Sequence, residues 1–274
     1  MRTSVNEIFE NISGFDSAVD SNVNNSRNKH QEIHDRYNLK RIREVLISAT
    51  RIEHSDIVLD AGCGTGELTI DALKFSQHVV SVDISFQSLM KAKDNVEEPL
   101  SNLILSDITE PCFRDGTFDV ILSSEVIEHI PTPLIMLRKL SQLLKPKAML
   151  AITSPNPMMM FFHVSILIWM ITHPRTAYRK MNRKENMWFR NWGWDRWIMP
   201  WHLDTMIRKI GLQVRTDMSR NMIFIPDNRG LMYRICSKLL DAKAFLMFLR
   251  SFERFEKSLL CWAGSRYLRV AEKL

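Results

Sequence analysis

Short apolar runs alternate with amphipathic segments through the middle of the chain. Apolar runs bounded by polar or glycine residues predict buried strands, here at residues 57–59, 79–83, 103–105, 118–122 and 148–153. The intervening segments carry apolar residues at helical spacing over 68–75, 85–96 and 133–144, and Ser85 is a suitable N-cap. Strands that alternate with helices predict an α/β fold, a doubly wound and mostly parallel sheet with helices on both faces.

The regions on either side of this core follow other patterns. We divide the chain into an N-terminal arm with a covering helix (1–50), a core (51–157), an insertion (158–201) and a completion of the core (202–274). In the last part the pattern predicts a helix at 202–210, a strand at 212–215, basic helices within 230–262 and a closing edge strand at 266–270.

The first predicted strand ends in a glycine-rich turn, residues 60–66, with the spacing G-x-G-x-G after an acidic residue. Glycine lets a strand turn sharply into a helix while its backbone approaches a ligand. A dinucleotide fingerprint would place its third glycine where this chain has Glu67, whose carboxylate would repel a pyrophosphate at the start of the helix. The turn instead suits a cofactor with a cationic centre and an amino-acid tail.

Two further strands also end in carboxylates. Asp83 follows Gly62 by 21 residues, a position from which an acid can accept both ribose hydroxyls of an adenosine group. Asp107 ends the third strand and could accept a proton from the adenine amine. The alternative is that both aspartates cap the helices that follow. Their order along the chain favours an adenosyl ligand.

Together these stretches resemble the class I S-adenosylmethionine-dependent methyltransferases, in particular small-molecule and quinone-precursor O-methyltransferases. The resemblance covers residues 56–154 and, more weakly, 202–218; it includes the glycine turn, both acid-ended strands, 118–121, 125–131 and 143–150. The family usually has glycines after Pro146, where this chain has Lys147 and Ala148. The resemblance implies a Rossmann-like sheet of seven strands and S-adenosylmethionine as cofactor, bound by residues 51–157.

Individual roles also follow from the resemblance. The methionine part of the cofactor would be bracketed by Asp60, Gly62, Gly64 and Gly66. Asp83 would bind the ribose and Asp107 the adenine amine, and the adenine ring would lie between Ile84 and Ile108.

Four residues after the fourth strand are candidates for chemistry on the methyl acceptor: Glu125, Glu128, His129 and His202. In one interpretation His129 or His202 is a general base for a phenol, hydroxyl or nitrogen acceptor. In a second, all four coordinate a divalent cation, as the resemblance to quinone-precursor and small-RNA 2′-O-methyltransferases suggests. In a third, which we favour over a metal site, Glu128 and His129 are structural.

The insertion and the C-terminal part differ from the core in charge. Residues 1–172 hold 16 Lys and Arg against 22 Asp and Glu, whereas residues 173–274 hold 21 against 9. Five tryptophans gather at 188, 192, 194, 197 and 201, after an apolar run at 158–171. The insertion could be an ordinary lid, the wall of a pocket for an apolar acceptor, or an attachment to a membrane surface. The apolar run argues against nucleic acid as a partner.

We therefore predict a methyltransferase for a small, hydrophobic or aromatic, even lipid-like acceptor, with oxygen favoured as the acceptor atom. The alternatives are an RNA 2′-O-methyltransferase and a non-catalytic cofactor-binding subunit. The N-terminus has no secretory signal pattern, and the apolar run is shorter than the roughly 20 residues of a spanning helix. We expect a cytoplasmic location with peripheral attachment to a membrane as an option, and the sequence leaves the oligomeric state open.

Overall fold

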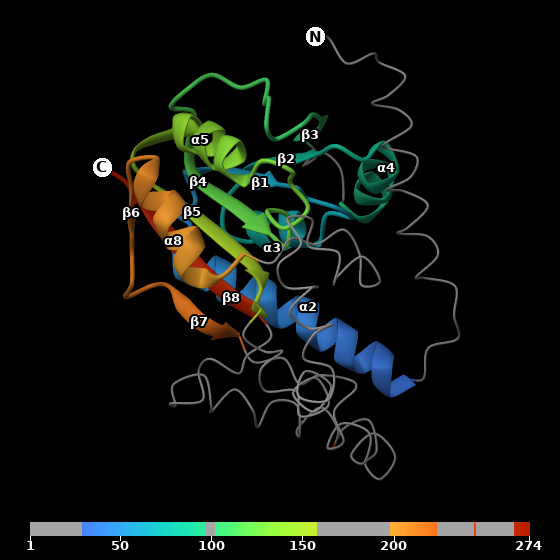
Figure 1. The fold of residues 1–274 in the computed structure, drawn as a ribbon. Helices are drawn as coiled ribbons and strands as arrows, with labels where there is room; N and C mark the ends of the chain where they lie inside the picture. Colours follow the sequence, from blue (N-terminus) through green and yellow to red (C-terminus); the bar gives the residue numbers. More distant parts are fainter. Residues whose placement is uncertain (1–28, 97–101, 158–197, 224–243, 245–265) are drawn as a thin grey trace, which may run out of the picture.

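The computed structural model describes residues 29–96, 102–157, 198–223, 244 and 266–274 (Figure 1). The N-terminal arm, most of the insertion with four of the five clustered tryptophans, and most of the predicted helices at 230–262 lie outside these residues. No helix in the described part of the chain is long and apolar enough to cross a membrane.

Within the described residues, eight strands form one sheet. They are β1 (Ile57–Ala61), β2 (His78–Asp83), β3 (Asn102–Leu105), β4 (Phe118–Ser124), β5 (Leu144–Pro155), β6 (Leu212–Val214), β7 (Arg220–Ile223) and β8 (Arg266–Lys273). Seven follow one another in the order β3-β2-β1-β4-β5-β8-β6, and β7 pairs with β8 beyond the end of β6. The first five are parallel, and β8 runs antiparallel to its neighbours. The predicted doubly wound sheet, seven strands wide, is confirmed.

Helices cover both faces of this sheet (Figure 1). They are α2 (Lys29–Thr50), α3 (Glu67–Leu73), α4 (Phe86–Asn95), α5 (Pro133–Leu143) and α8 (Pro200–Lys209). One core forms where α2 and α3 pack on the sheet, and a second forms under α5 and α8. Alternate residues of one strand therefore serve different cores, as with Val58 and Leu59. The predicted cap of α4 is confirmed, because Ser85 Oγ accepts a hydrogen bond from Ser88 N.

The last strand does not lie where the sequence placed it. We expected residues 266–270 to close an edge of the sheet, but β8 lies inside it, between β5 and β6. Its central residues are buried on both faces, with Tyr267 and Ala271 in one core and Leu268 and Val270 in the other. Burial on both faces is the property of an inner strand.

The position of β1 determines where a ligand can bind. Its neighbours are β2 on one side and β4 on the other, so the chain crosses over in opposite directions from this point. In open α/β sheets, ligands bind beyond the carboxyl ends of the strands at such a switch point. The glycine-rich turn and the residues after β4 both lie there.

Candidate functional site

The three glycines of the turn after β1 serve different purposes. A Cβ atom on Gly62 would lie 2.3 Å from Val126 Cγ2, and one on Gly66 would meet Ala92 and Val96 at 3.1 Å. These two glycines allow close packing against the residues after β4 and against α4. Gly64, with φ +53, has no atom within 4 Å of a built Cβ. The backbone at Gly64 therefore faces open space, where a ligand can approach it closely.

Asp83 fixes this turn from the end of β2. Its Oδ2 accepts a hydrogen bond from Gly64 N at 2.8 Å, and its Oδ1 accepts one from Ser85 N at 2.8 Å. The carboxylate is half-buried and joins the glycine turn to the start of α4. Because an ionised carboxylate has about four acceptor positions, both oxygens can accept further hydrogen bonds from a ligand.

Asp60 lies buried beneath the turn. Thr69 Oγ1 donates to its Oδ2 at 2.7 Å, while Oδ1 has no hydrogen-bond partner among the described residues. Burial raises the pKa of Asp60 to about 7; the Thr69 hydrogen bond opposes this rise, and repulsion from Asp83 and Glu67 adds to it. A cationic group of a ligand above the turn would stabilise the ionised form. The site therefore fits the cationic amino acid end of the predicted cofactor.

The third acidic strand end is arranged differently. Asp107 is exposed, and its Oδ1 accepts hydrogen bonds from the backbone N of Thr109 at 2.7 Å and from its hydroxyl at 2.8 Å. Ile108 is buried, whereas Ile84 is 42% exposed beside Asp83. Ile84 follows the end of β2, and Asp107 and Ile108 follow the end of β3. A backbone hydrogen bond from Ser106 N to Asp83 O joins these two neighbouring strand ends. Their roles toward an adenine ring stay predictions.

The segment after β4 is a tight turn rather than a helix. His129 N donates to Val126 O at 3.0 Å, and Glu125 has a φ of +58. Glu125 forms an ion pair with Arg266 at the start of β8. Glu128 points inward and is 1% exposed, and its Oε2 accepts a hydrogen bond from Ser154 Oγ at 3.1 Å. Burial raises the pKa of Glu128, repulsion from Glu125 adds to the rise, and His129 and Arg266 oppose it.

The two candidate histidines are exposed. His129 lies at the end of the turn, and His202 lies in the first turn of α8 with its ring centroid 6.0 Å from that of Trp201. Within the described part of the chain, no group of three or more His, Cys, Asp and Glu side chains is arranged to hold a metal ion. Two of the four predicted metal ligands instead contact other residues. Glu125 forms an ion pair with Arg266, and Glu128 accepts a hydrogen bond from Ser154. The four residues do not fit a cation in this arrangement.

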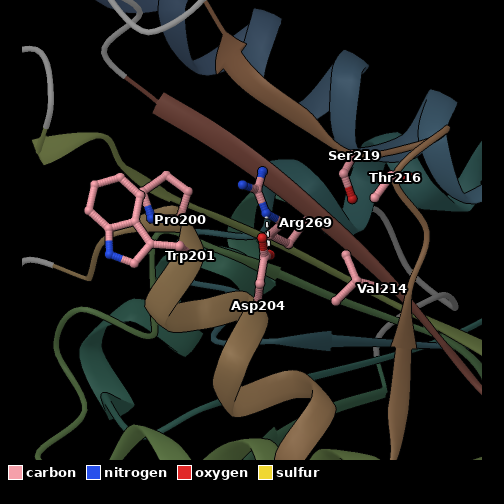
Figure 2. A pocket seen from close by; sticks show the side chains of 7 residues that line it. All are labelled: Pro200, Trp201, Asp204, Val214, Thr216, Ser219 and Arg269. Atoms are coloured by element: carbon pink, nitrogen blue, oxygen red, sulfur yellow. Dashed lines mark hydrogen bonds and ion pairs between the residues drawn. The ribbon is translucent and has the colours of Figure 1, made fainter.

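A pocket of about 250 Å³ opens between α8, β8 and the connection from β6 to β7. Figure 2 shows Arg269 at its centre, paired with Asp204 of α8, while Trp201 forms one wall. The distance from Arg269 Nε to Asp204 Oδ1 is 2.5 Å, and Arg269 is 4% exposed. Two strands, β4 and β5, lie between β1 and β8, so the pocket is on a different part of the sheet from the glycine turn.

Sequence reasoning did not find the cationic residues of β8. Arg266 and Arg269 stand in a strand whose other central residues are buried, and each pairs with an acid distant in the chain. The signal was present in the two arginines, three residues apart, among the apolar residues of 266–270. A charge inside an apolar strand indicates a buried partner, but it does not indicate which one.

Comparison with known families agrees with this geometry. A family model described as a methyltransferase domain matches residues 59–152, which contain the glycine turn, Asp83, Asp107 and the turn after β4. Residues 59–152 are a methyltransferase domain by this match, and the sheet around them has the class I S-adenosylmethionine-dependent methyltransferase architecture. The predicted family is thereby confirmed, while the roles of the individual site residues stay predictions.

Several relatives of this methyltransferase carry a more specific name. It is 28% identical over 113 residues to a ubiquinone biosynthesis O-methyltransferase of Colwellia psychrerythraea, covering 40% of this chain and 46% of that protein. It is 26% identical over 198 residues to one of Neisseria meningitidis, covering 68% and 72%. The chain thus spans about half of the first relative and about seven tenths of the second.

A solved structure supports the fold. An S-adenosylmethionine-dependent methyltransferase from Mesorhizobium loti superposes with a TM-score of 0.57 at 12% identity, over 84% of this chain and 96% of that one. At this identity the likeness concerns the architecture of the sheet and its helices.

Proposed function

We propose that the protein transfers a methyl group from S-adenosylmethionine to an oxygen atom of a small, hydrophobic or aromatic acceptor. The observation that carries the cofactor half of this proposal is the turn after β1. Gly64 faces open space there, above the buried carboxyl of Asp60 and beside the half-buried carboxylate of Asp83. Such an arrangement fits a ligand with a cationic end and a diol.

The residues that would hold the cofactor divide by position. Asp60 and the glycine turn would hold the methionine end, Asp83 the ribose, and Asp107 with Ile84 and Ile108 the adenine. When bound, S-adenosylmethionine supplies an electrophilic methyl group on its sulfonium. The protein then has to align the acceptor, exclude water and receive a proton from the acceptor oxygen.

The acceptor half rests on two observations. The relatives named above are O-methyltransferases of ubiquinone biosynthesis, which favours oxygen as the acceptor atom. Trp201 is 45% exposed beside the pocket at α8, on the side of the sheet beyond β4 and β5, and an indole provides rigid apolar area for a hydrophobic molecule. His129, in the turn after β4, and His202, in the first turn of α8, are the candidates for the proton acceptor, because both are open to solvent.

Titration calorimetry with S-adenosylmethionine tests the cofactor half. We expect saturable 1:1 binding by the wild type and at least a tenfold loss of affinity in Asp83→Ala, since hydrogen bonds to a charged group contribute about 1.5–3 kcal/mol each. Asp115→Ala is a matched control, because this exposed carboxylate precedes β4 at the opposite edge of the sheet. Absence of binding, or equal binding by Asp83→Ala and the wild type, would refute the assignment.

Flotation with liposomes and filter retention of RNA test the expected partners. A hydrophobic acceptor reached from a membrane predicts co-flotation with anionic vesicles at moderate salt and no retention of RNA. Retention of RNA without flotation would favour an RNA 2′-O-methyltransferase instead.

A further inference from the structure

An ion pair stands beside the glycine turn, at the carboxyl ends of β4 and β5. Arg266 Nε contacts Glu125 Oε2. The two residues are distant in the chain and meet because β4 and β8 both pair with β5. Val126, the next residue after Glu125, is the side chain that packs against Gly62. The ion pair therefore lies one residue away from a direct contact with the turn proposed to hold the cofactor.

The fold holds Glu125 in an uncommon conformation. Its φ of +58 lies in the left-handed region, which non-glycine residues seldom adopt. A hydrogen bond from Glu125 N to Thr153 O at 3.1 Å fixes this residue against β5. Local strain of this kind persists where the surrounding structure holds a side chain in a required position.

One oxygen of the Glu125 carboxylate makes no hydrogen bond within the described residues. Oε2 faces Arg266, whereas Oε1 is shielded from water and has no hydrogen-bond partner among the described residues. A shielded carboxylate oxygen without a donor is costly, and a ligand that brings a donor removes this cost. Because a carboxylate offers only lone pairs, the matching ligand group is a hydroxyl or an N–H, not an ether or a second carboxylate.

We propose that the Glu125–Arg266 pair recognises the hydroxyl group of the methyl acceptor, a proposal that rests on the proposed function. The hydroxyl donates to Glu125 Oε1, and Arg266 fixes the carboxylate through Oε2. Arg266 acts through Glu125 and is thus a positioning residue. The acceptor class is an apolar or aromatic molecule with a free hydroxyl, held at the edge of the sheet next to the glycine turn.

Binding of two matched probes tests this proposal. Catechol carries two hydroxyls, and veratrole is the same ring with both hydroxyls methylated. We expect the wild-type complex with S-adenosylhomocysteine to bind catechol at least tenfold more tightly than veratrole in calorimetry. Arg266→Gln and Glu125→Gln should each weaken catechol about tenfold and leave veratrole and S-adenosylhomocysteine unchanged. Arg266→Lys should restore part of the loss, because it keeps the charge.

Arg215→Gln is the matched control. Arg215 pairs with Glu272 at the other end of β8, and the side chains of that pair are 33% and 24% exposed, close to 31% and 23% for Arg266 and Glu125. We expect the Arg215→Gln variant to bind catechol and veratrole with the same affinities as the wild type. Equal affinity of the wild type for the two probes, no binding of catechol, or an equal effect of Arg215→Gln would overturn the proposal. Absence of S-adenosylhomocysteine binding would instead contradict the proposed function, and this proposal with it.

Discussion

Replacement of Asp60 by Asn removes a buried carboxyl group and keeps an oxygen that can accept the hydrogen bond of Thr69. In the folded protein the pKa of Asp60 is raised from 3.8 to about 7, chiefly by burial. The unfolded chain loses this proton near pH 4, whereas the folded protein keeps it up to about pH 7. The folded state therefore binds more protons in this window, and its stability falls as the pH rises from 4 to 7.

The size of this effect follows from the two pKa values. A change from 3.8 to about 7 corresponds to about 4 kcal/mol, since each pH unit is equivalent to 1.36 kcal/mol. Asp60→Asn does not titrate, so its stability relative to the wild type should rise with pH by up to about 4 kcal/mol between pH 4 and 7 and then level off. Urea unfolding followed by circular dichroism at pH 4.5, 5.5, 6.5 and 7.5 measures this difference. A difference that does not change with pH would refute the reasoning.

Asp71→Asn is a control whose stability relative to the wild type should change with pH in the opposite direction. Burial alone would raise the pKa of Asp71, but hydrogen bonds and ion pairs with Lys74 and Arg43 outweigh it and lower the pKa. This carboxylate therefore stabilises the folded state above the pKa of the unfolded chain, and its stabilising effect is lost as the pH falls through the lowered value. The stability of Asp71→Asn relative to the wild type should fall, not rise, as the pH increases.

Three further substitutions test packing, ligand access and burial. Gly62→Ala should lose about 2–5 kcal/mol of stability, because the added Cβ meets a side chain at 2.3 Å and the φ is +87, whereas Gly64→Ala should lose only about 1–2 kcal/mol. In calorimetry Gly64→Ala should nevertheless weaken S-adenosylmethionine binding, since its Cβ enters the space left for the ligand; unchanged affinity would contradict this. Asp204→Ala should cost about 3–5 kcal/mol in urea unfolding, since it leaves the buried guanidinium of Arg269 without its carboxylate. A loss no larger than that of Asp217→Ala, in an exposed ion pair, would contradict that role.

The local parts of the fold were predictable from the sequence because they depend on neighbouring residues. The strand predicted at 57–59, which the structure extends to Ala61, and the cap at Ser85 each follow from a pattern within a few positions. The inner position of β8 was not predictable, since it depends on pairing with β5 and β6 across more than fifty residues. The pattern over 266–270 is compatible with an edge strand or an inner strand.

In the candidate site, too, local features were predictable from the sequence and long-range contacts were not. Gly62, Gly64 and Asp83 were found from their spacing, and the structure joins Gly64 to Asp83 directly. The surroundings of Glu125 and Glu128 were not found, because the sequence does not show that one pairs with Arg266 and the other is buried against β5. Tertiary pairs of this kind carry no short-range signal.

The central claim is that the turn after β1 binds S-adenosylmethionine between Asp60 and Asp83. The most direct test is a crystal structure of the protein with S-adenosylhomocysteine. We expect ribose hydroxyls within hydrogen-bond distance of Asp83 and the amino acid end of the ligand over Gly64. A ligand bound elsewhere, or bound without contact to Asp83 and the glycine turn, would contradict it.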